Sequence, residues 1–144
     1  MGQVALDITM SLDGFVTGPD DGPDQGLGEG GEVLHYWVFG GPWTYDGQRD
    51  FDAMGVDKDV LDSATSAGAA VVAGDKPVNV GGGASIAQQA LRAGLLDELH
   101  LHIAPVILRA GRPLFGELGT RLQLERTRTI ESPYATHIDY RITG

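Results

Sequence analysis

The sequence predicts an α/β protein in which a mixed sheet is flanked by helices and ends in a C-terminal antiparallel hairpin. Three observations predict this class. Short apolar runs with the alternation of strands occur in both halves of the chain. A segment with helical spacing, residues 85–94, ends at a glycine between two of these runs. With 144 residues the chain has about the length of one domain, so we expect a single domain over residues 1–144.

The N-terminal segment predicts a strand followed by a long loop. In VALDITMSLDG, residues 4–14, apolar side chains alternate with others until the pattern breaks at Asp13 and Gly14. Residues 18–31, GPDDGPDQGLGEGG, hold so much Gly, Asp and Pro that no regular element is expected there. Because a long loop inside a compact domain often has a functional role, we expect a lid or substrate loop.

The middle of the chain predicts short helices and strands. Leu34, Trp37 and Val38 lie at helical spacing and favour a short helix within residues 32–43. Residues 56–68 begin with acidic side chains and end at a glycine, as a helix with a favourable N-terminal charge does. Two apolar runs then predict strands, AAVVAG at residues 69–74 and VNVGG at residues 78–82.

The second half predicts a helix, a strand and a hairpin. Gly94 closes the segment 85–94 in the position just after the last helical residue, and Leu95 could fold back onto Ala90. Alternating leucines and histidines in residues 97–108 predict a half-buried strand. The same alternation on both sides of a Ser-Pro turn predicts an antiparallel hairpin, with strands at residues 121–132 and 135–143.

Composition excludes several classes of protein. The chain has no cysteine, so it offers no disulfide, thiolate zinc site or cysteine nucleophile. No window is long and apolar enough to span a bilayer, and the N-terminus lacks a basic signal region, so we expect a cytoplasmic protein without a membrane partner. The net charge is -10, and residues 1–64 hold thirteen acidic side chains against two basic ones. This charge argues against a nucleic-acid partner.

A run of glycines, Gly81, Gly82 and Gly83, lies between a predicted strand and a predicted helix. Unpaired N–H groups and the positive end of the helix dipole converge at such a point, and glycine lets a pyrophosphate approach the backbone. The run lacks the ending of a Walker loop, and Ile86 stands where the dinucleotide fingerprint has its last glycine. On the local pattern alone, a phosphate site and a plain tight turn both stay open.

The histidines carry a weaker signal. His100 and His102 fall on the same face of their predicted strand, a spacing that could hold a metal. No third ligand is recognisable nearby, so we predict a partly exposed pair and no metal site. His35 and His137 stand alone in the sequence, and we predict structural roles for both.

Acidic residues offer one candidate for chemistry. Asp13 lies where the first strand ends beside two loops, so its carboxylate could orient a polar substrate, although Asp-Gly is also a common turn. Asp97 and Glu98 face opposite sides of a strand, which argues against joint acid–base work and favours Asp97 as a cap at the strand entry. No nucleophile elbow is present, so hydrolysis has no support.

Four stretches together resemble the bacterial dihydrofolate-reductase-like family, whose relatives include the reductase domain of the riboflavin-biosynthesis deaminase-reductase. They are TMSLDGFVTG, VNVGGGASIAQQALRAGLLDELHLHIAPVIL, GRPLF and THIDYRIT, and LHYWVF at residues 34–39 is also similar to a segment in many members. The resemblance implies a dihydrofolate-reductase-like mixed sheet flanked by helices. It also implies NADPH as the hydride donor and often a homodimer.

The resemblance also assigns site residues. The turn beside nicotinamide and substrate corresponds to Ser11, Leu12, Asp13 and Gly14, with Asp13 as the candidate catalytic residue. Trp37 and Phe39 are candidates for the wall of the substrate pocket. The cofactor-binding residues implied are Gly74, Gly81, Gly82, Gly83, Ala84 and Ser85.

One departure from the family follows Gly74. The family continues there with Gly-Arg-Arg/Lys-Thr-Tyr/Phe and a further strand and helix, whereas this chain continues with Asp75, Lys76 and Pro77. The segment that the family has here is absent from this sequence, either because the chain has lost it or because the sequence joins two segments that flank it. Lys76 is the only cation near the place where the family has a phosphate-binding arginine. We expect an NADPH-dependent reductase of a small polar heterocycle of the pterin or aminopyrimidine type. The alternatives are a reductase-like scaffold without activity that acts as a dimeric binding module, and a nucleotide-binding sensor.

Overall fold

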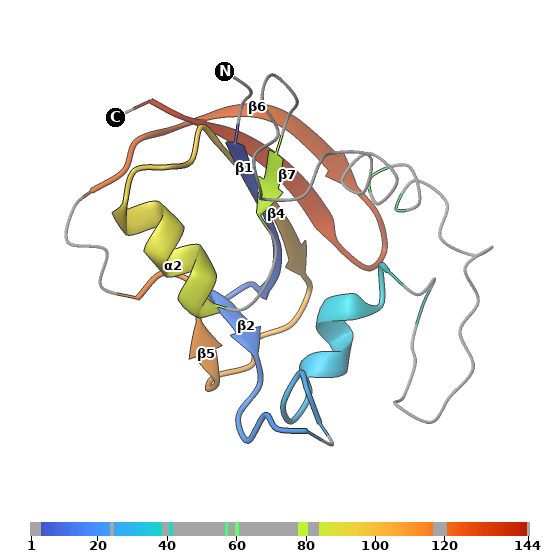
Figure 1. Cartoon of the computed structure of the whole chain (residues 1–144). Helices are drawn as coiled ribbons and strands as arrows, with labels where there is room; N and C mark the ends of the chain where they lie inside the picture. The colour runs from blue at the N-terminus through green and yellow to red at the C-terminus, as the bar shows by residue number, and fades with distance from the viewer. Residues whose placement is uncertain are drawn as a thin grey trace.

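A five-stranded mixed sheet organises the chain (Figure 1). The computed structural model describes residues 4–23, 25–38, 41, 57, 60, 78–80, 84–116 and 121–143. Within them the strand order is β3-β1-β4-β7-β6. The strands are β1 (Val4–Ser11), β3 (Val78–Val80), β4 (Glu98–Ala104), β6 (Leu124–Glu131) and β7 (Thr136–Ile142).

The sheet is parallel on one side and antiparallel on the other. β1 pairs in parallel with β3 and with β4, whereas β7 runs antiparallel to both β4 and β6. The carboxyl ends of β3, β1 and β4 therefore meet at one edge of the sheet. A second, two-stranded sheet pairs β2 (Phe15–Thr17) with β5 (Arg112–Pro113). The predicted dihydrofolate-reductase-like mixed sheet and its C-terminal hairpin are confirmed.

The helix α2 (Ala84–Arg92) covers one face of the sheet (Figure 1). Alternate residues of β1 point to this face and pack with leucines of α2 and β4, because successive side chains of a strand point to opposite faces. This core is fully apolar and contains Leu6, Ile8, Met10, Val16, Ala87, Ala90, Leu91, Leu96, Leu99, Leu101 and Leu114.

The end of α2 confirms the predicted glycine cap. Gly94 has φ +67°, and its N–H donates to the carbonyl of Leu91 at 3.3 Å. The N–H of Leu95 donates to the carbonyl of Ala90 at 3.2 Å. These two bonds form a Schellman motif, which satisfies carbonyls that the helix end would leave unpaired.

On the other face lies η1 (Gly31–His35), a 3-10 helix. The sequence predicted an ordinary helix within residues 32–43, and this was wrong in type. The N–H of Tyr36 donates to Val33, three residues back, and a turn follows directly. A run this short between glycine-rich segments makes the tighter i→i+3 bonds of short helices. In the predicted helix 56–68 the structure describes only Asp57 and Val60, both helical, and the predicted strand 69–74 lies outside the described residues.

The C-terminal hairpin joins β6 and β7 through the turn at Ser132 and Pro133. The Ser132 hydroxyl accepts hydrogen bonds from the N–H groups of Tyr134 and Ala135. Near the opposite end of β7, Asp97 was predicted to cap the entry of its own strand, but its carboxylate caps the entry of β1 instead. Its carboxylate accepts the N–H of Val4 at 2.8 Å, and its carbonyl accepts the N–H of Ile142 at 2.9 Å.

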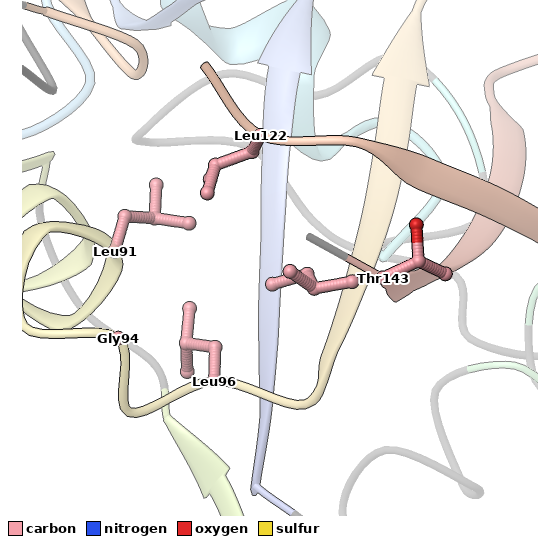
Figure 2. Close-up of a pocket in the computed structure, with 6 residues that line it drawn as sticks. Leu91, Gly94, Leu96, Leu122 and Thr143 are labelled. Carbon is pink, nitrogen blue, oxygen red and sulfur yellow. The ribbon is translucent and has the colours of Figure 1, made fainter. Parts of the chain in front are cut away.

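A small apolar pocket of about 290 Å³ opens between α2 and the end of β7. Figure 2 shows Leu91, Leu96 and Leu122 pointing toward one another across it, while the Thr143 hydroxyl points away. The pocket lies at the amino end of β4, so it is at the opposite edge of the sheet from the carboxyl ends of the parallel strands. Among the described residues, no helix has the length and apolar character to cross a membrane.

Candidate functional site

The turn after β1 is held rigidly at the carboxyl edge of the sheet. Ser11 is fully buried, and its hydroxyl donates to the Asp13 carboxylate at 2.5 Å and accepts the N–H of Phe15 at 3.0 Å. Gly14 has φ +91°, a conformation that favours glycine, and its carbonyl accepts the N–H of Leu114. Leu12 is 64% exposed, but its N–H donates to the carbonyl of Val106.

Asp13 joins this turn to the loop that follows β4. Its two carboxylate oxygens accept the N–H groups of Leu108 at 3.1 Å and Arg109 at 2.8 Å. The hydrogen bond from Ser11 is the main cause that lowers the pKa of Asp13, and these backbone groups add to it, so the side chain is a carboxylate. The Asp13 carboxylate therefore joins the turn after β1 to the loop after β4.

The loop after β4 also lies directly against β2, at a close approach that involves Gly111. Gly111 has φ +135°, and a Cβ built there would lie 1.9 Å from the carbonyl oxygen of Thr17. Only glycine fits this approach, since real Cβ atoms do not come so close to a backbone oxygen. The residues after β4 are thus set against the start of the 18–31 loop.

An open pocket of about 550 Å³ lies between these two loops. This volume is in the range of small-molecule sites. It combines apolar side chains with one acidic and one basic residue, and its lining residues are Pro19, Glu29, Gly30, Val33, Val106, Ile107, Leu108, Arg109 and Ala110. The 18–31 loop, predicted as a lid or substrate loop, supplies one wall.

The cofactor residues implied by the resemblance are described only in part. Ala84 and Ser85 are the first residues of α2, which begins three residues after the carboxyl end of β3. The N-terminus of α2 is therefore at the same edge of the sheet as Asp13. Its first turn holds no acidic side chain. Gly74, Gly81, Gly82 and Gly83 lie outside the described residues, as does Phe39.

Trp37 lies over the opposite face of the sheet from α2. Its side chain is 3% exposed, and the indole Nε1 donates to the Thr9 hydroxyl at 3.1 Å. The ring packs against two imidazoles, with ring centroids 4.4 Å from His102 and 4.8 Å from His137. Trp37 does not line the pocket of about 550 Å³, so its role as a pocket wall stays a prediction.

The positions of His102 and His137 differ from what the sequence predicted. His102 is 2% exposed rather than partly exposed, and His137 is not isolated. His102 and His137 sit opposite each other in the register of β4 and β7, and their Nδ1 atoms are 2.7 Å apart. His102 Nε2 also bonds the Asp7 carboxylate, and His137 Nε2 lies 2.6 Å from Asp57 Oδ1. Four titratable side chains therefore form one row, which is buried at His102, His137 and Asp57 and partly exposed at Asp7.

The row has an exposed end at His100. Its ring lies 3.7 Å from the Asp7 carboxylate and 2.9 Å from Glu98. The contact with Asp7 is the main cause that raises the pKa of His100 to about 9, and it outweighs the opposing effect of burial. Burial by itself would raise the pKa of Asp7, but its contacts with His100 and His102 hold it at about 2. Asp7 is therefore ionised at neutral pH.

One signal in the sequence could have found this row. Asp7 interrupts the apolar pattern of its strand, His102 lies between two apolar residues of its own strand, and His137 precedes the apolar Ile138. A buried polar side chain needs a hydrogen-bond partner, so the polar residues in these three apolar strands are expected to bond one another. The partners depend on the strand register, which no single strand reveals. No group of three or more His, Cys, Asp or Glu among the described residues has the arrangement of a metal site.

Comparisons with known proteins confirm the resemblance. Residues 69–136 match the family model of the RibD C-terminal domain. A relative in Bacillus subtilis (strain 168), the uncharacterized protein YyaP, is 43% identical over 53 residues, which are 35% of this chain and 28% of YyaP. The aligned part thus spans little more than a quarter of that relative.

Solved structures show the same fold. A putative riboflavin biosynthesis protein from Shewanella sp. PV-4 is 20% identical with a TM-score of 0.54, and 100% of each chain is covered. A pyrimidine reductase-like protein from Corynebacterium diphtheriae is 14% identical with a TM-score of 0.56, covering 99% of this chain and 92% of the other. The riboflavin biosynthesis reductase of Saccharomyces cerevisiae is 14% identical with a TM-score of 0.52, covering 99% and 89%.

Proposed function

We propose that this chain, a relative of the RibD C-terminal domain over residues 69–136, is an NADPH-dependent reductase of a small polar heterocycle. The heterocycle is of the pterin or aminopyrimidine type. The observation that carries the proposal is the pocket of about 550 Å³ beside the Asp13 turn. Ligands of open α/β sheets bind outside the carboxyl ends of the strands, and this pocket follows the carboxyl end of β4.

The cofactor end of the site fits an anion. α2 has nine residues and begins at the carboxyl edge without an acidic side chain in its first turn, so its dipole favours a phosphate there. Ala84 and Ser85 start this helix, and with Gly81, Gly82 and Gly83 they would hold the pyrophosphate. NADPH supplies a hydride to the substrate when it is bound. The protein then needs to align the substrate, exclude water and provide a proton.

The lining of the pocket suits a flat polar ring. Val33 and Ile107 offer apolar surface to the faces of such a ring, while Glu29 and Arg109 offer an acceptor and a donor to its edges. Asp13 is the candidate to hydrogen-bond the substrate, and its fixed carboxylate gives that contact a defined geometry. Because the charges of Glu29 and Arg109 oppose each other, the pocket favours a ring with donor and acceptor edges over a simple anion.

The test of this proposal is a titration with NADPH and, separately, NADH, followed by the quenching of Trp37 and Trp43 fluorescence. We expect saturable binding with NADPH well ahead of NADH. Gly82→Val should abolish the binding, because it adds a side chain where the pyrophosphate must approach. Gly26→Val is the matched control, since a Cβ at Gly26 meets nothing within 4 Å.

Two outcomes would contradict the proposal or one of its parts. Absence of binding by either cofactor at millimolar concentration would favour the reductase-like scaffold, which the departure after Gly74 suggests. Asp13→Asn should impair turnover more than cofactor binding, and an unchanged rate would remove Asp13 from the mechanism.

A further inference from the structure

Arg109 has a backbone conformation that arginine rarely adopts. Its φ is +70°, and among the described residues other than glycine only Asp20, with φ +59°, shares a positive φ. Aspartate reaches this left-handed region more easily, because its short side chain can hydrogen-bond locally. In arginine the conformation costs free energy that the surrounding structure must supply. Because Arg109 also lines the pocket of about 550 Å³, this strain points to a functional role.

The carboxylate of Asp13 holds Arg109 in this conformation. The N–H of Arg109 donates to Asp13 Oδ2 at 2.8 Å, and the N–H of Leu108 donates to Oδ1 at 3.1 Å. The fully buried Ser11 donates its hydroxyl to the same Oδ1, so the carboxylate is itself anchored to a buried group. Beyond Arg109, the close approach of Gly111 to β2 limits how far the chain can shift. The backbone of Arg109 is therefore fixed from both directions.

The side chain of Arg109 is available to a ligand. It lines the pocket from the wall after β4, while Glu29 lines it from the 18–31 loop. Within the described part of the chain, neither side chain takes part in an ion pair or a side-chain hydrogen bond. The Glu29 backbone is also fixed, since its N–H donates to the carbonyl of Pro19 at 2.7 Å. Both walls are thus ordered before a ligand arrives, which lowers the entropy cost of binding.

The two unpaired side chains determine which edges of a ring fit the pocket. The Arg109 guanidinium presents N–H donors in a planar fork, which matches two neighbouring acceptors. The Glu29 carboxylate accepts hydrogen bonds, so the other edge of the ring needs N–H donors. A ring with acceptors at both edges would leave Glu29 without a partner, which costs affinity. The pocket therefore selects for the order of donors and acceptors around the ring.

We propose that Arg109 is the specificity-determining residue of this pocket and that Asp13 is its positioning residue. Arg109 binds two neighbouring acceptors at one edge of the substrate ring, and Asp13 acts through the backbone of Arg109. Asp13 Oδ1 already accepts two hydrogen bonds and Oδ2 one, so most of the acceptor capacity of this carboxylate is used within the protein. The inference rests on the proposed function, because that function makes the bound ring a substrate.

The selection is tested by NMR titration of the protein with isocytosine, without cofactor. The N1–H tautomer of this ring has N3 and a carbonyl oxygen as neighbouring acceptors, and N–H donors at its other edge. Arg109→Gln should weaken the binding by about tenfold, because hydrogen bonds to a charged group are lost. The binding of 2-aminopyrimidine, which lacks the carbonyl, should change much less. Arg126→Gln, at an exposed arginine of β6, is the matched control and should change neither affinity.

The positioning role is tested with a double variant. Asp13→Asn should weaken isocytosine binding roughly fivefold, because the amide nitrogen of asparagine cannot accept one of the two N–H groups. In the Arg109→Gly background the same change should have no further effect. No side chain is then left to position, and glycine adopts the left-handed region without help. An equal loss in both backgrounds would overturn the positioning role, since Asp13 would then act without Arg109.

A measurement on the unmodified protein covers the case in which Asp13→Asn does not fold. The N–H of Arg109 belongs to an exposed residue and has its bond to Asp13, so its hydrogen exchange should be slow. Rapid exchange of this amide would overturn the positioning role.

The titrations also separate this inference from the proposed function. If the unmodified protein fails to bind isocytosine up to the solubility limit, or if Arg109→Gln binds it equally well, the selection by Arg109 is wrong. Absence of NADPH binding would remove the reductase activity from the proposal. It would leave these results unchanged, because the titrations contain no cofactor.

Discussion

At the scale of single residues, the contact between His100 and Asp7 links stability to pH. Both groups have shifted pKa values in the folded chain, about 9 for His100 and about 2 for Asp7. A histidine whose pKa is raised on folding stabilises the protein below its unfolded value of 6.5 and loses that contribution as the pH rises. An aspartate whose pKa is lowered stabilises the protein above 3.8 and loses its contribution as the pH falls.

The resulting prediction concerns alkaline pH. Between pH 6.5 and about 9, the free energy of unfolding should fall by less than about 3 kcal/mol, the full value of the pKa shift of His100, because solvent screens this partly exposed ring. Urea denaturation at a series of pH values measures this directly. His100→Gln should flatten the profile over that window and also weaken the acid limb below pH 4, because His100 is one of the two histidines that lower the pKa of Asp7. If the free energy of unfolding of His100→Gln fell with pH as steeply as that of the unmodified protein, another group would be the cause of the pH dependence.

Single residues also show where reasoning from sequence reaches its limit. The turn at Asp13 was predicted from local pattern, because the Ser11–Asp13 hydrogen bond forms within the turn, whereas the contacts of Asp13 with Leu108 and Arg109 and of Asp97 with Val4 join distant parts of the chain. The partnership of His102 with His137 was not predicted, since it depends on which strands are neighbours and in which register. The pocket between the loops was not predicted either, because its two walls come from distant parts of the chain and meet only in the folded sheet.

At the scale of elements, strands and helix ends were predicted well and the short helix poorly. Alternation revealed β1, β4, β6 and β7, since one side of each strand differs from the other in chemistry. The end of α2 was predicted because a left-handed residue after a helix strongly favours glycine. Between glycine-rich segments, η1 has only five residues, and spacing cannot tell a 3-10 helix from an α-helix over that length.

The cap of α2 gives a prediction for this scale. Gly94→Ala should lower the free energy of unfolding by about 1 kcal/mol, the cost of a side chain in the left-handed region. A Cβ there meets nothing within 4 Å, so the effect comes from the backbone alone. Gly26→Ala, at an equally open position without a positive φ, is the control and should cost little. Equal urea midpoints for the two variants would contradict this account.

At the scale of the whole molecule, β6 is the most exposed part of the described sheet. It lies at the end of the strand order, and seven of its eight residues are exposed. An edge strand with free backbone groups is a template for pairing with another chain. The resemblance stated above implies a homodimer in many relatives. We expect a second copy of this chain to cover β6.

Sedimentation equilibrium tests this expectation. The unmodified chain should be a dimer at micromolar concentration. The double variant Leu124→Lys, Thr129→Lys should shift it toward monomer, because lysines on an edge strand oppose pairing. Leu95→Lys, at another exposed leucine beyond α2, is the control and should leave the dimer intact. A stable monomer of the unmodified chain would contradict the expectation.

The place of β1 in the sheet has a consequence for how the chain folds. Its first residue is tied to Asp97, 93 positions away, and its register partners lie in β3 and β4. A long loop must close before such contacts form, whereas the β6–β7 hairpin needs only its four-residue turn. We therefore expect β1 to join the sheet late. The row cannot be complete before that step, since Asp7 arrives with β1, and His102 therefore gains its carboxylate partner only in the final stage of folding.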